Sequence, residues 1–141
     1  MELAKYSMGI GDRFARQGRA QLSAIVQAKA LGVDIVPVWN KSNREHMIVH
    51  THPDSVRVEA DAAVKALGWT GPYHVDADHI NLKNVDAFIS ASDFFTLDVA
   101  DFVGQAAPEA EIQVFVARHQ RYATALRIPG IDRTLNISPQ D

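Results

Sequence analysis

Two stretches of the sequence end almost identically, and this near repeat constrains the fold more than any other feature. Residues 30–33 read ALGV and residues 66–69 read ALGW, and each quartet closes a stretch in which apolar residues recur with helical spacing. A mostly apolar run follows each quartet, at residues 34–40 and at residues 72–78. A helix that ends at a glycine and leads into a buried strand, twice at a regular interval, predicts repeated βα units.

The same alternation of strand and helix continues to residue 104. Strands are expected at residues 5–11, 34–40, 72–78 and 94–99, and helices at residues 14–31, 53–68 and 81–89. Continuous apolar runs suit strands that are buried on both faces, as in a parallel sheet. The sequence therefore predicts an α/β fold in which residues 1–104 form the first βα units of a (β/α) TIM-like barrel.

The pattern changes after Gly104. Pro108 opens a stretch with helical spacing, and a hairpin that turns at Pro129-Gly130 is expected after it. Residues 138–141 have the composition of a helix N-terminus. We therefore expect residues 105–141 to form a helix plus a hairpin-like insertion that leads into a helix outside this sequence, and the barrel to be incomplete in this chain.

The composition excludes several classes of function. The 141 residues contain 14 Lys and Arg against 17 Asp and Glu, a net charge of −3, which offers no basic surface for nucleic acid or an anionic membrane. Cysteine is absent from the sequence, so a metal site could use only His and carboxylate ligands. We identify no secretory signal or membrane span and expect a cytoplasmic protein.

Polar residues follow each of the four expected strands. They are Asp12 and Arg13 after the first strand, Asn40 and Lys41 after the second, Asp76, Asp78 and His79 after the third, and Asp98 after the fourth. Charged groups beside a sheet core are costly unless they are paired or bound to metal, and barrel enzymes place their active sites at this end of the strands. These side chains are therefore the candidates for a functional site.

The densest cluster lies at residues 74–79, which read HVDADH. Strand alternation puts His74, Asp76 and Asp78 on one face, and His79 can turn toward the mouth of the barrel. Asp78 could then exchange a proton with a substrate while His79 offers a neutral imidazole to a divalent ion. In the alternative interpretation, Asp78 caps a helix that begins near Asn81 and His79 is an ordinary loop histidine.

Two further histidines suggest a different class of enzyme. His50 and His52 form an H-x-H pattern, which can bind zinc in a metal-dependent hydrolase. Alternatively they are exposed loop histidines next to the helix that begins at Pro53.

Two short basic segments could hold an anionic substrate. Arg13 follows a G-x-G turn, whose backbone N–H groups can approach an anion, and Lys41 and Arg44 share the next loop. In the simpler interpretation, Arg13 pairs with Asp12 and the second segment is a solvated basic loop. The sequence contains no Walker A, GxSxG or third-glycine dinucleotide motif, so phosphoryl transfer, serine hydrolysis and nicotinamide chemistry have no support.

Four segments resemble one known family. Residues 5–14 (KYSMGIGDRF), 51–61 (THPDSVRVEAD), 76–82 (DADHINL) and 128–133 (IPGIDR) are similar to the tagaturonate/fructuronate epimerase family of bacterial hexuronate catabolism. DADHINL is the most specific of these motifs, and together they span nearly the whole chain. Family members are considerably longer than this chain, which agrees with the expectation of an incomplete barrel.

The resemblance implies a divalent-metal-dependent isomerase with a keto-uronate substrate and no nucleotide cofactor. Such an enzyme inverts C4 and thereby interconverts D-tagaturonate and D-fructuronate. Carried over by motif, Asp78 matches the proton acceptor and His79 a metal ligand, while the proton donor and the other ligands are expected beyond Asp141. The oligomeric state and the identity of the metal stay open.

A retro-aldol route is the mechanism we expect, because C4 lies β to the C2 ketone and direct deprotonation of C4 is not activated. In this route the ketone is polarised by the metal, the C3–C4 bond breaks, and the two parts recombine on the other face. Asp12, Arg13, Lys41 and Asp76 are the expected substrate-binding residues, with Arg13 and Lys41 on the carboxylate. The chain alone is expected to be inactive, and the non-enzymatic alternative is a small sugar-acid binding module.

Overall fold

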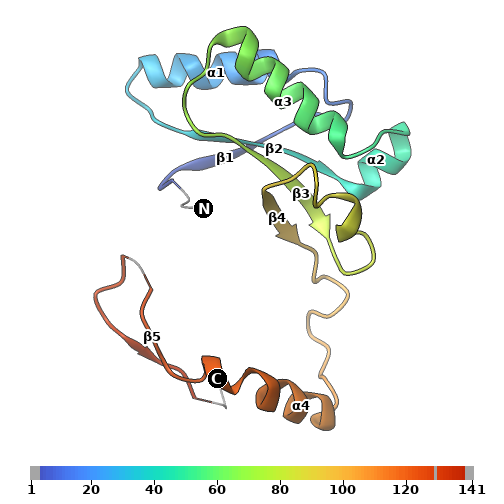
Figure 1. The fold of residues 1–141 in the computed structure, drawn as a ribbon, viewed down its shortest axis with the longest axis vertical. Coiled ribbons are helices and arrows are strands. Elements are labelled where there is room, and N and C mark those ends of the chain that lie inside the picture. The colour runs from blue at the N-terminus through green and yellow to red at the C-terminus, as the bar shows by residue number, and fades with distance from the viewer. Residues whose placement is uncertain (1–3, 129, 139–141) are drawn as a thin grey trace. The chain divides into compact units, whose positions relative to one another are not determined.

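The structure is a computed structural model that describes residues 4–128 and 130–138. The chain divides into two compact units, Met1–Asp101 and Phe102–Asp141, which are described separately (Figure 1). All of the candidate site residues belong to the first unit.

The first unit contains a parallel sheet and the helices that pack on it. Its elements are β1 (Ser7–Ile10), α1 (Gly18–Ala30), β2 (Val36–Ser42), α2 (Asn43–Val49), α3 (Asp54–Leu67), β3 (His74–Ile80), the 3-10 helix η1 (Val85–Ala87) and β4 (Phe94–Leu97). The four strands pair in parallel in the order β1-β2-β3-β4. The expected α/β class and parallel sheet are thereby confirmed.

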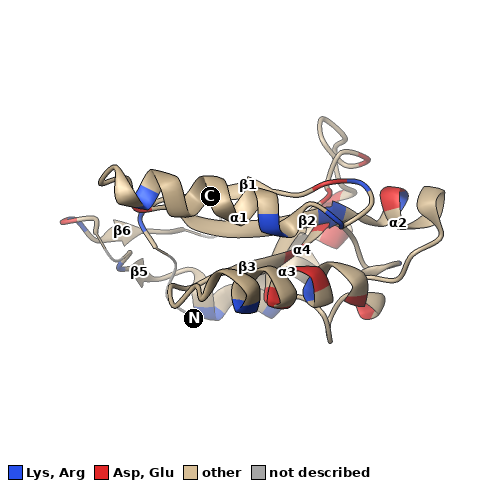
Figure 2. Cartoon of the chain, turned by 90° about the horizontal axis from the view of Figure 1, so that it is seen from above, with Lys and Arg blue, Asp and Glu red and all other residues tan. Residues whose placement is uncertain are grey.

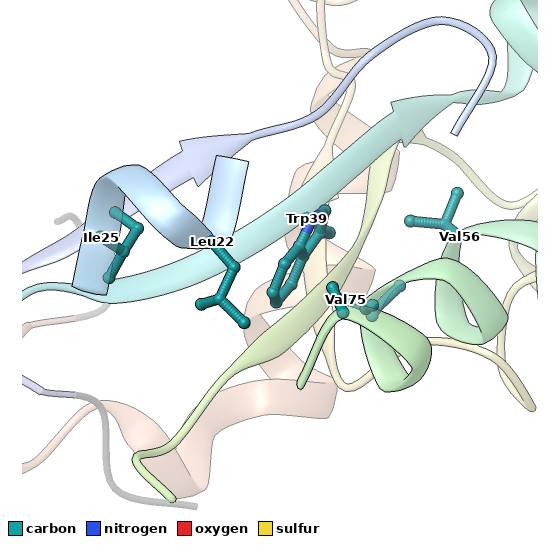
Figure 3. Close-up of a cluster of buried hydrophobic side chains, with 7 residues drawn as sticks. Leu22, Ile25, Trp39, Val56 and Val75 are labelled. Atoms are coloured by element: carbon teal, nitrogen blue, oxygen red, sulfur yellow. The ribbon is translucent and has the colours of Figure 1, made fainter. Parts of the chain in front are cut away.

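The core lies between the sheet and the two long helices, α1 and α3, which cover one of its faces (Figure 1). Its buried members are Leu22, Ile25, Trp39, Val56, Ala60, Ala63 and Val75 (Figure 3). Trp39 is the largest of them and is 2% exposed. Its indole N–H donates to Oε1 of Gln21 at 3.2 Å, so the one polar atom of this side chain is satisfied.

The pairing of β2 with β3 sorts the side chains onto the two faces of the sheet. Trp39 lies opposite Val75, and both belong to the core beneath the helices. Because side chains alternate along a strand, His74, Asp76 and Asp78 lie on the opposite face, as the sequence predicts.

Helix α1 begins later than expected, at Gly18 instead of residue 14. The carboxylate of Asp12 accepts the backbone N–H groups of Phe14, Arg16 and Gln17 at 2.9–3.4 Å. These bonds stabilise a compact turn between β1 and the helix, as an Asx-type side chain commonly does.

The segment after β2 is a helix, and the expectation of a basic loop there is wrong. Ser42 and Glu45 form a capping box: the backbone N–H of Glu45 donates to Oγ of Ser42 at 3.3 Å, and the Ser42 N–H donates to Oε2 of Glu45 at 3.0 Å. The motif S-x-x-E was visible in the sequence. It starts α2 without an intervening turn after the strand.

An α-helix is expected at residues 81–89, but the structure has none there. β3 continues to Ile80, and only the 3-10 helix η1 follows. Here the side chains of Asn81 and Asn84 bind backbone N–H groups, those of Lys83 and Asn81 respectively, at 2.9 and 2.8 Å. Such local bonds compete with a regular helix.

Helix α3 carries charges of both signs (Figure 2). One of its arginines contacts the residues that precede β4. Arg57 donates from Nε to the carbonyl of Ala91 at 2.9 Å and lies 3.2 Å from Oδ1 of Asp93. The same Oδ1 accepts the Val75 N–H at 2.8 Å. This network connects α3, β3 and the residues that precede β4.

The second unit contains α4 (Glu109–His119), the 3-10 helix η2 (Gln120–Tyr122) and the short antiparallel strands β5 (Ala125–Leu126) and β6 (Leu135–Asn136). The helix after Pro108 and the hairpin are thus confirmed. Of the expected turn, Gly130 has a positive φ of 83° and Pro129 lies outside the described residues. The expected helix start at residues 138–141 lies almost wholly outside them. Among the described helices, none has the length and apolar character needed to cross a bilayer.

We expect Leu22→Ala to destabilise the protein by about 3 kcal/mol, because Leu22 is 0% exposed and its truncation leaves a cavity in the core. Urea unfolding of the complete gene product, followed by tryptophan fluorescence, measures this loss. The matched control is Leu31→Ala: Leu31 is 83% exposed, and its truncation should change the free energy of unfolding by less than about 0.5 kcal/mol. Equal effects of the two substitutions would contradict this placement of the core.

Candidate functional site

A cavity of about 460 Å³ lies at the carboxyl ends of the strands in the first unit. Its polar walls come from the start of α2 and from the segments that follow β3 and β4: Asn43, Arg44, His79, Asn81, Asn84 and Asp98. A volume of this size is typical of sites for small molecules. The residues that follow β3 and β4 are thus brought together at one edge of the sheet.

His79 stands at the end of β3, next to two carboxylates. Its backbone has a φ of 55°, in the left-handed region that a non-glycine residue seldom adopts. Nε2 lies 3.9 Å from Oδ1 of Asp78, and Nδ1 lies 3.8 Å from Oδ2 of Asp98. The structure therefore brings Asp78, His79 and Asp98 together. A register shift between Ala77 and Ile80 accompanies this turn of the strand.

Asp78 is not among the residues that hold the turn after β3. The turn after β3 is held by the amide oxygens of Asn81 and Asn84, as described above. The Asp78 side chain is 17% exposed. Among the described residues, its one ion-pair partner is His79. The capping alternative for Asp78 is therefore not the arrangement formed, and its role as an acid or base stays a prediction.

Asp76 is buried on the same face of β3. Its Oδ2 accepts the hydroxyl of Thr96 at 2.7 Å, and its Oδ1 has no partner among the described residues. Burial raises the pKa of the Asp76 carboxyl above its ordinary value, and the charge of Asp78 adds to this effect. A buried carboxylate oxygen without a partner is costly, which marks Asp76 as a candidate for binding a ligand.

Lys41 lies on the helix side of β2, away from Asp76 and Asp78. It is 1% exposed, and its Nζ donates to Oγ1 of Thr51 at 2.7 Å. Burial lowers the pKa of the Lys41 ammonium. The same Thr51 oxygen lies 3.0 Å from Nδ1 of His46, a residue of α2 that is 3% exposed. We call Lys41, Thr51 and His46 the buried triad.

The buried triad is not predicted from the sequence. His46 is the fourth residue of α2 and Thr51 lies two residues beyond its end, a spacing that matches no known motif. Only the packing of α2 on the sheet, with the His46 ring 5.7 Å from that of Phe88, makes the contact visible.

Asp12 and Arg13 lie at the turn that follows β1. Asp12 binds the backbone N–H groups described above, and Arg13 lies 3.8 Å from Oε1 of Glu45, so the alternative of an Arg13–Asp12 pair is not the one formed. A Cβ at Gly11 would overlap the backbone oxygen of Asn40, which explains the second glycine by close approach to β2. Substrate contacts by Asp12, Arg13 and Lys41 stay a prediction.

The donors for a metal ion are of the right type but too few. Imidazole and carboxylate groups meet at His79, Asp78 and Asp98, yet the described residues contain no group of three or more His, Asp or Glu that could hold a metal. His50 is exposed, and His52 pairs with Asp54 at 3.2 Å. Neither histidine pattern forms a complete metal site within the described part of the chain.

Comparison with protein families decides the affiliation. Residues 1–133 match the UxaE family, tagaturonate epimerase. The chain belongs to this family. The expected resemblance is thereby confirmed over nearly the whole length of the chain.

The fold of this family member is similar to that of solved structures. The native crystal structure of fructuronate-tagaturonate epimerase UxaE from Cohnella laeviribosi matches with a TM-score of 0.61 and 20% identity, over 94% of this chain and 29% of that chain. A glycerol complex of the same protein matches with a TM-score of 0.59 and 19% identity over the same shares. The chain thus spans less than a third of these structures. No curated protein sequence matches it.

We expect His46 to make the stability depend on pH. Burial first, and the Lys41 charge second, lower the pKa of His46 from 6.5 to about 4. Between these values the unfolded chain takes up a proton and the folded chain does not. Stability is therefore fully present above pH 6.5 and is lost as the pH falls toward 4, by on the order of 3 kcal/mol.

Urea unfolding at a series of pH values from 7 to 4 tests this dependence. His46→Gln should flatten the curve relative to the unsubstituted protein, whereas His52→Gln, at an exposed position, should leave it unchanged. A slope that is the same in the unsubstituted protein and in His46→Gln would contradict the assignment.

Proposed function

We propose that this chain supplies part of the active site of an epimerase that interconverts D-tagaturonate and D-fructuronate by inverting C4. One observation carries the proposal: in a chain of the tagaturonate epimerase family, His79 of the DADHINL motif and Asp98 line one cavity, and Nε2 of His79 lies 3.9 Å from Oδ1 of Asp78. The cavity suits a small polar molecule, and its walls offer amide, carboxylate, imidazole and guanidinium groups.

In the proposed reaction Asp78 acts as the base. It removes the proton of the 4-hydroxyl, the C3–C4 bond breaks, C4 becomes an aldehyde, and the electron pair moves to C3 as the enolate of the C2 ketone. The aldehyde turns over and C3 adds to its opposite face. A proton donor from elsewhere in the protein protonates the new C4 oxygen, and Asp78 releases its proton to solvent. No net oxidation occurs, which agrees with the absence of any nicotinamide motif in the sequence.

The neighbours of Asp78 support this role. Nε2 of His79 lies 3.9 Å from Oδ1 of Asp78, so His79 can orient the base, and Nδ1 of His79 lies 3.8 Å from Oδ2 of Asp98. His79 and Asp98 both line the cavity, where they can bind hydroxyl groups of the sugar. Oδ1 of Asp76, which has no protein partner among the described residues, is available to a substrate hydroxyl on the same face of β3.

A divalent ion belongs to this proposal, with His79 as the one ligand we assign to this chain. Because the described residues do not complete a ligand set, the remaining ligands would come from elsewhere in the protein. We also propose that β1–β4 are the first strands of a (β/α) barrel. Sequential parallel strands with helices on one face support this architecture, as does the lack of a further strand on β1 or β4 among the described residues.

We expect Asp78→Asn to lower kcat for epimerisation by about 100-fold or more, with a smaller change in KM, because the amide cannot accept the hydroxyl proton. Conversion of D-tagaturonate to D-fructuronate by the complete gene product is followed by chromatography. Asp86→Asn is the matched control, since Asp86 is an exposed residue of η1. An unchanged kcat in Asp78→Asn would contradict the role of Asp78 as the base.

Metal content separates the epimerase from the hydrolase alternative. We expect a chelator to abolish epimerisation, and His79→Ala to lower the divalent metal that remains bound after dialysis, as measured by mass spectrometry. The double variant His50→Ala and His52→Ala should keep its metal and its activity. Loss of metal in the double variant alone would favour the hydrolase, and turnover in the presence of excess chelator would contradict the metal.

A further inference from the structure

One of the residues that line the cavity is an arginine, Arg44, which the sequence offers only as part of a basic segment that could hold an anion. Arg44 is an exposed residue in the first turn of α2 and lines the same cavity as His79 and Asp98. Within the described residues it has no carboxylate partner. A guanidinium presents a planar fork of N–H donors that matches a carboxylate.

The other two basic candidates near this edge of the sheet are already engaged. Arg13 lies 3.8 Å from Oε1 of Glu45. Lys41 is buried on the helix side of β2 and donates to Thr51. Binding a substrate through either side chain would require breaking an internal contact, whereas Arg44 needs no such change.

We propose that Arg44 binds the carboxylate of the sugar-acid substrate in this cavity, an inference that rests on the proposed epimerase function. The substrate class follows from the charges: an anion meets the guanidinium at one wall of the cavity, and its hydroxyl groups meet the amides of Asn81 and Asn84. The oxygens of these two amides are occupied by backbone N–H groups. Their NH2 groups are therefore the atoms left to donate to hydroxyl oxygens.

The position of Arg44 is held by the fold. The capping box of Ser42 and Glu45 starts α2 directly at the end of β2. The contact of His46 with Thr51 in the buried triad holds the helix at a second point. Arg44 therefore reaches the cavity from a helix that is anchored at two points. A group anchored in this way binds with less loss of conformational freedom than one on a mobile loop.

Arg44 also has a task during the proposed reaction. Cleavage of the C3–C4 bond divides the six-carbon keto-uronate into a three-carbon enolate, from C1 to C3, and a three-carbon aldehyde, from C4 to C6, that bears the carboxylate. No covalent bond then connects the aldehyde to the rest of the substrate. Arg44 holds this fragment by its carboxylate while C4 turns over, so that the two fragments recombine.

The first test compares charged and neutral ligands of the same shape. We expect Arg44→Gln in the complete gene product to raise KM for D-tagaturonate by about 10- to 100-fold. The same variant should weaken inhibition by D-galactonate to a similar extent and leave inhibition by galactitol, which lacks the carboxylate, within about twofold. Arg19→Gln, which removes the same charge from an exposed position on α1, is the control and should change none of these values.

The second test concerns the fragments. Arg44→Gln should release 2-hydroxy-3-oxopropanoate and dihydroxyacetone into solution during turnover, and the unsubstituted protein should not. Arg44→Lys keeps the charge without the fork and should recover part of the affinity, which provides a readout if Arg44→Gln folds poorly.

The outcomes separate this inference from the function on which it rests. If the unsubstituted protein epimerises D-tagaturonate and Arg44→Gln leaves both KM and inhibition by D-galactonate unchanged, the inference is overturned and the epimerase stands. If the unsubstituted protein binds D-galactonate through Arg44 but has no epimerase activity, the proposed function fails and the carboxylate site stands. Equal weakening of D-galactonate and galactitol would show that Arg44 acts on the shape of the cavity, which also overturns the inference.

Discussion

The parallel pairing of β2 with β3 determines where every polar group of this site lies. Trp39 opposite Val75 commits one face of both strands to the core beneath α1 and α3. Alternation then leaves Asp76 and Asp78 on the other face, since a shift by one residue would exchange the faces of the whole strand. Such a shift would move the large Trp39 indole out of the core and would therefore destabilise the protein. The hydrophobic effect thereby positions groups that take no part in it.

The polar residues near this edge divide into two groups with different environments. Lys41 and His46 both contact Thr51 beneath α2, and burial lowers the pKa values of both basic groups. Nε2 of His46 has no partner among the described residues. Asp76 and Asp78 lie on the open face, where Asp76 has a raised pKa and an oxygen without a partner among the described residues. The hydrogen bond from Lys41 to Thr51 helps to hold α2 in place, whereas the buried Oδ1 of Asp76 can be satisfied by a ligand.

The family affiliation and the geometry support each other at different levels. The match over residues 1–133 assigns the chain to the tagaturonate epimerases, while about 20% identity to the solved structures establishes the fold alone. The chain spans 29% of the native crystal structure of UxaE from Cohnella laeviribosi. Within the described residues, His79 and its two carboxylate neighbours do not form a complete metal site.

The sequence by itself determined the α/β class, the order of the strands, the face that carries Asp76 and Asp78, and the family, because periodicity and short motifs are local properties. Only the tertiary structure decided that α2 replaces a loop, that Asn81 and Asn84 shorten the following helix to η1, and that Lys41 and His46 meet at Thr51. It also decided that Arg44, and neither Arg13 nor Lys41, lines the cavity. The capping box and the two asparagines did carry local signals. In contrast, Lys41 and Thr51 meet only because α2 packs against the sheet, and the residues that line the cavity come from separate segments whose contact has no local signal.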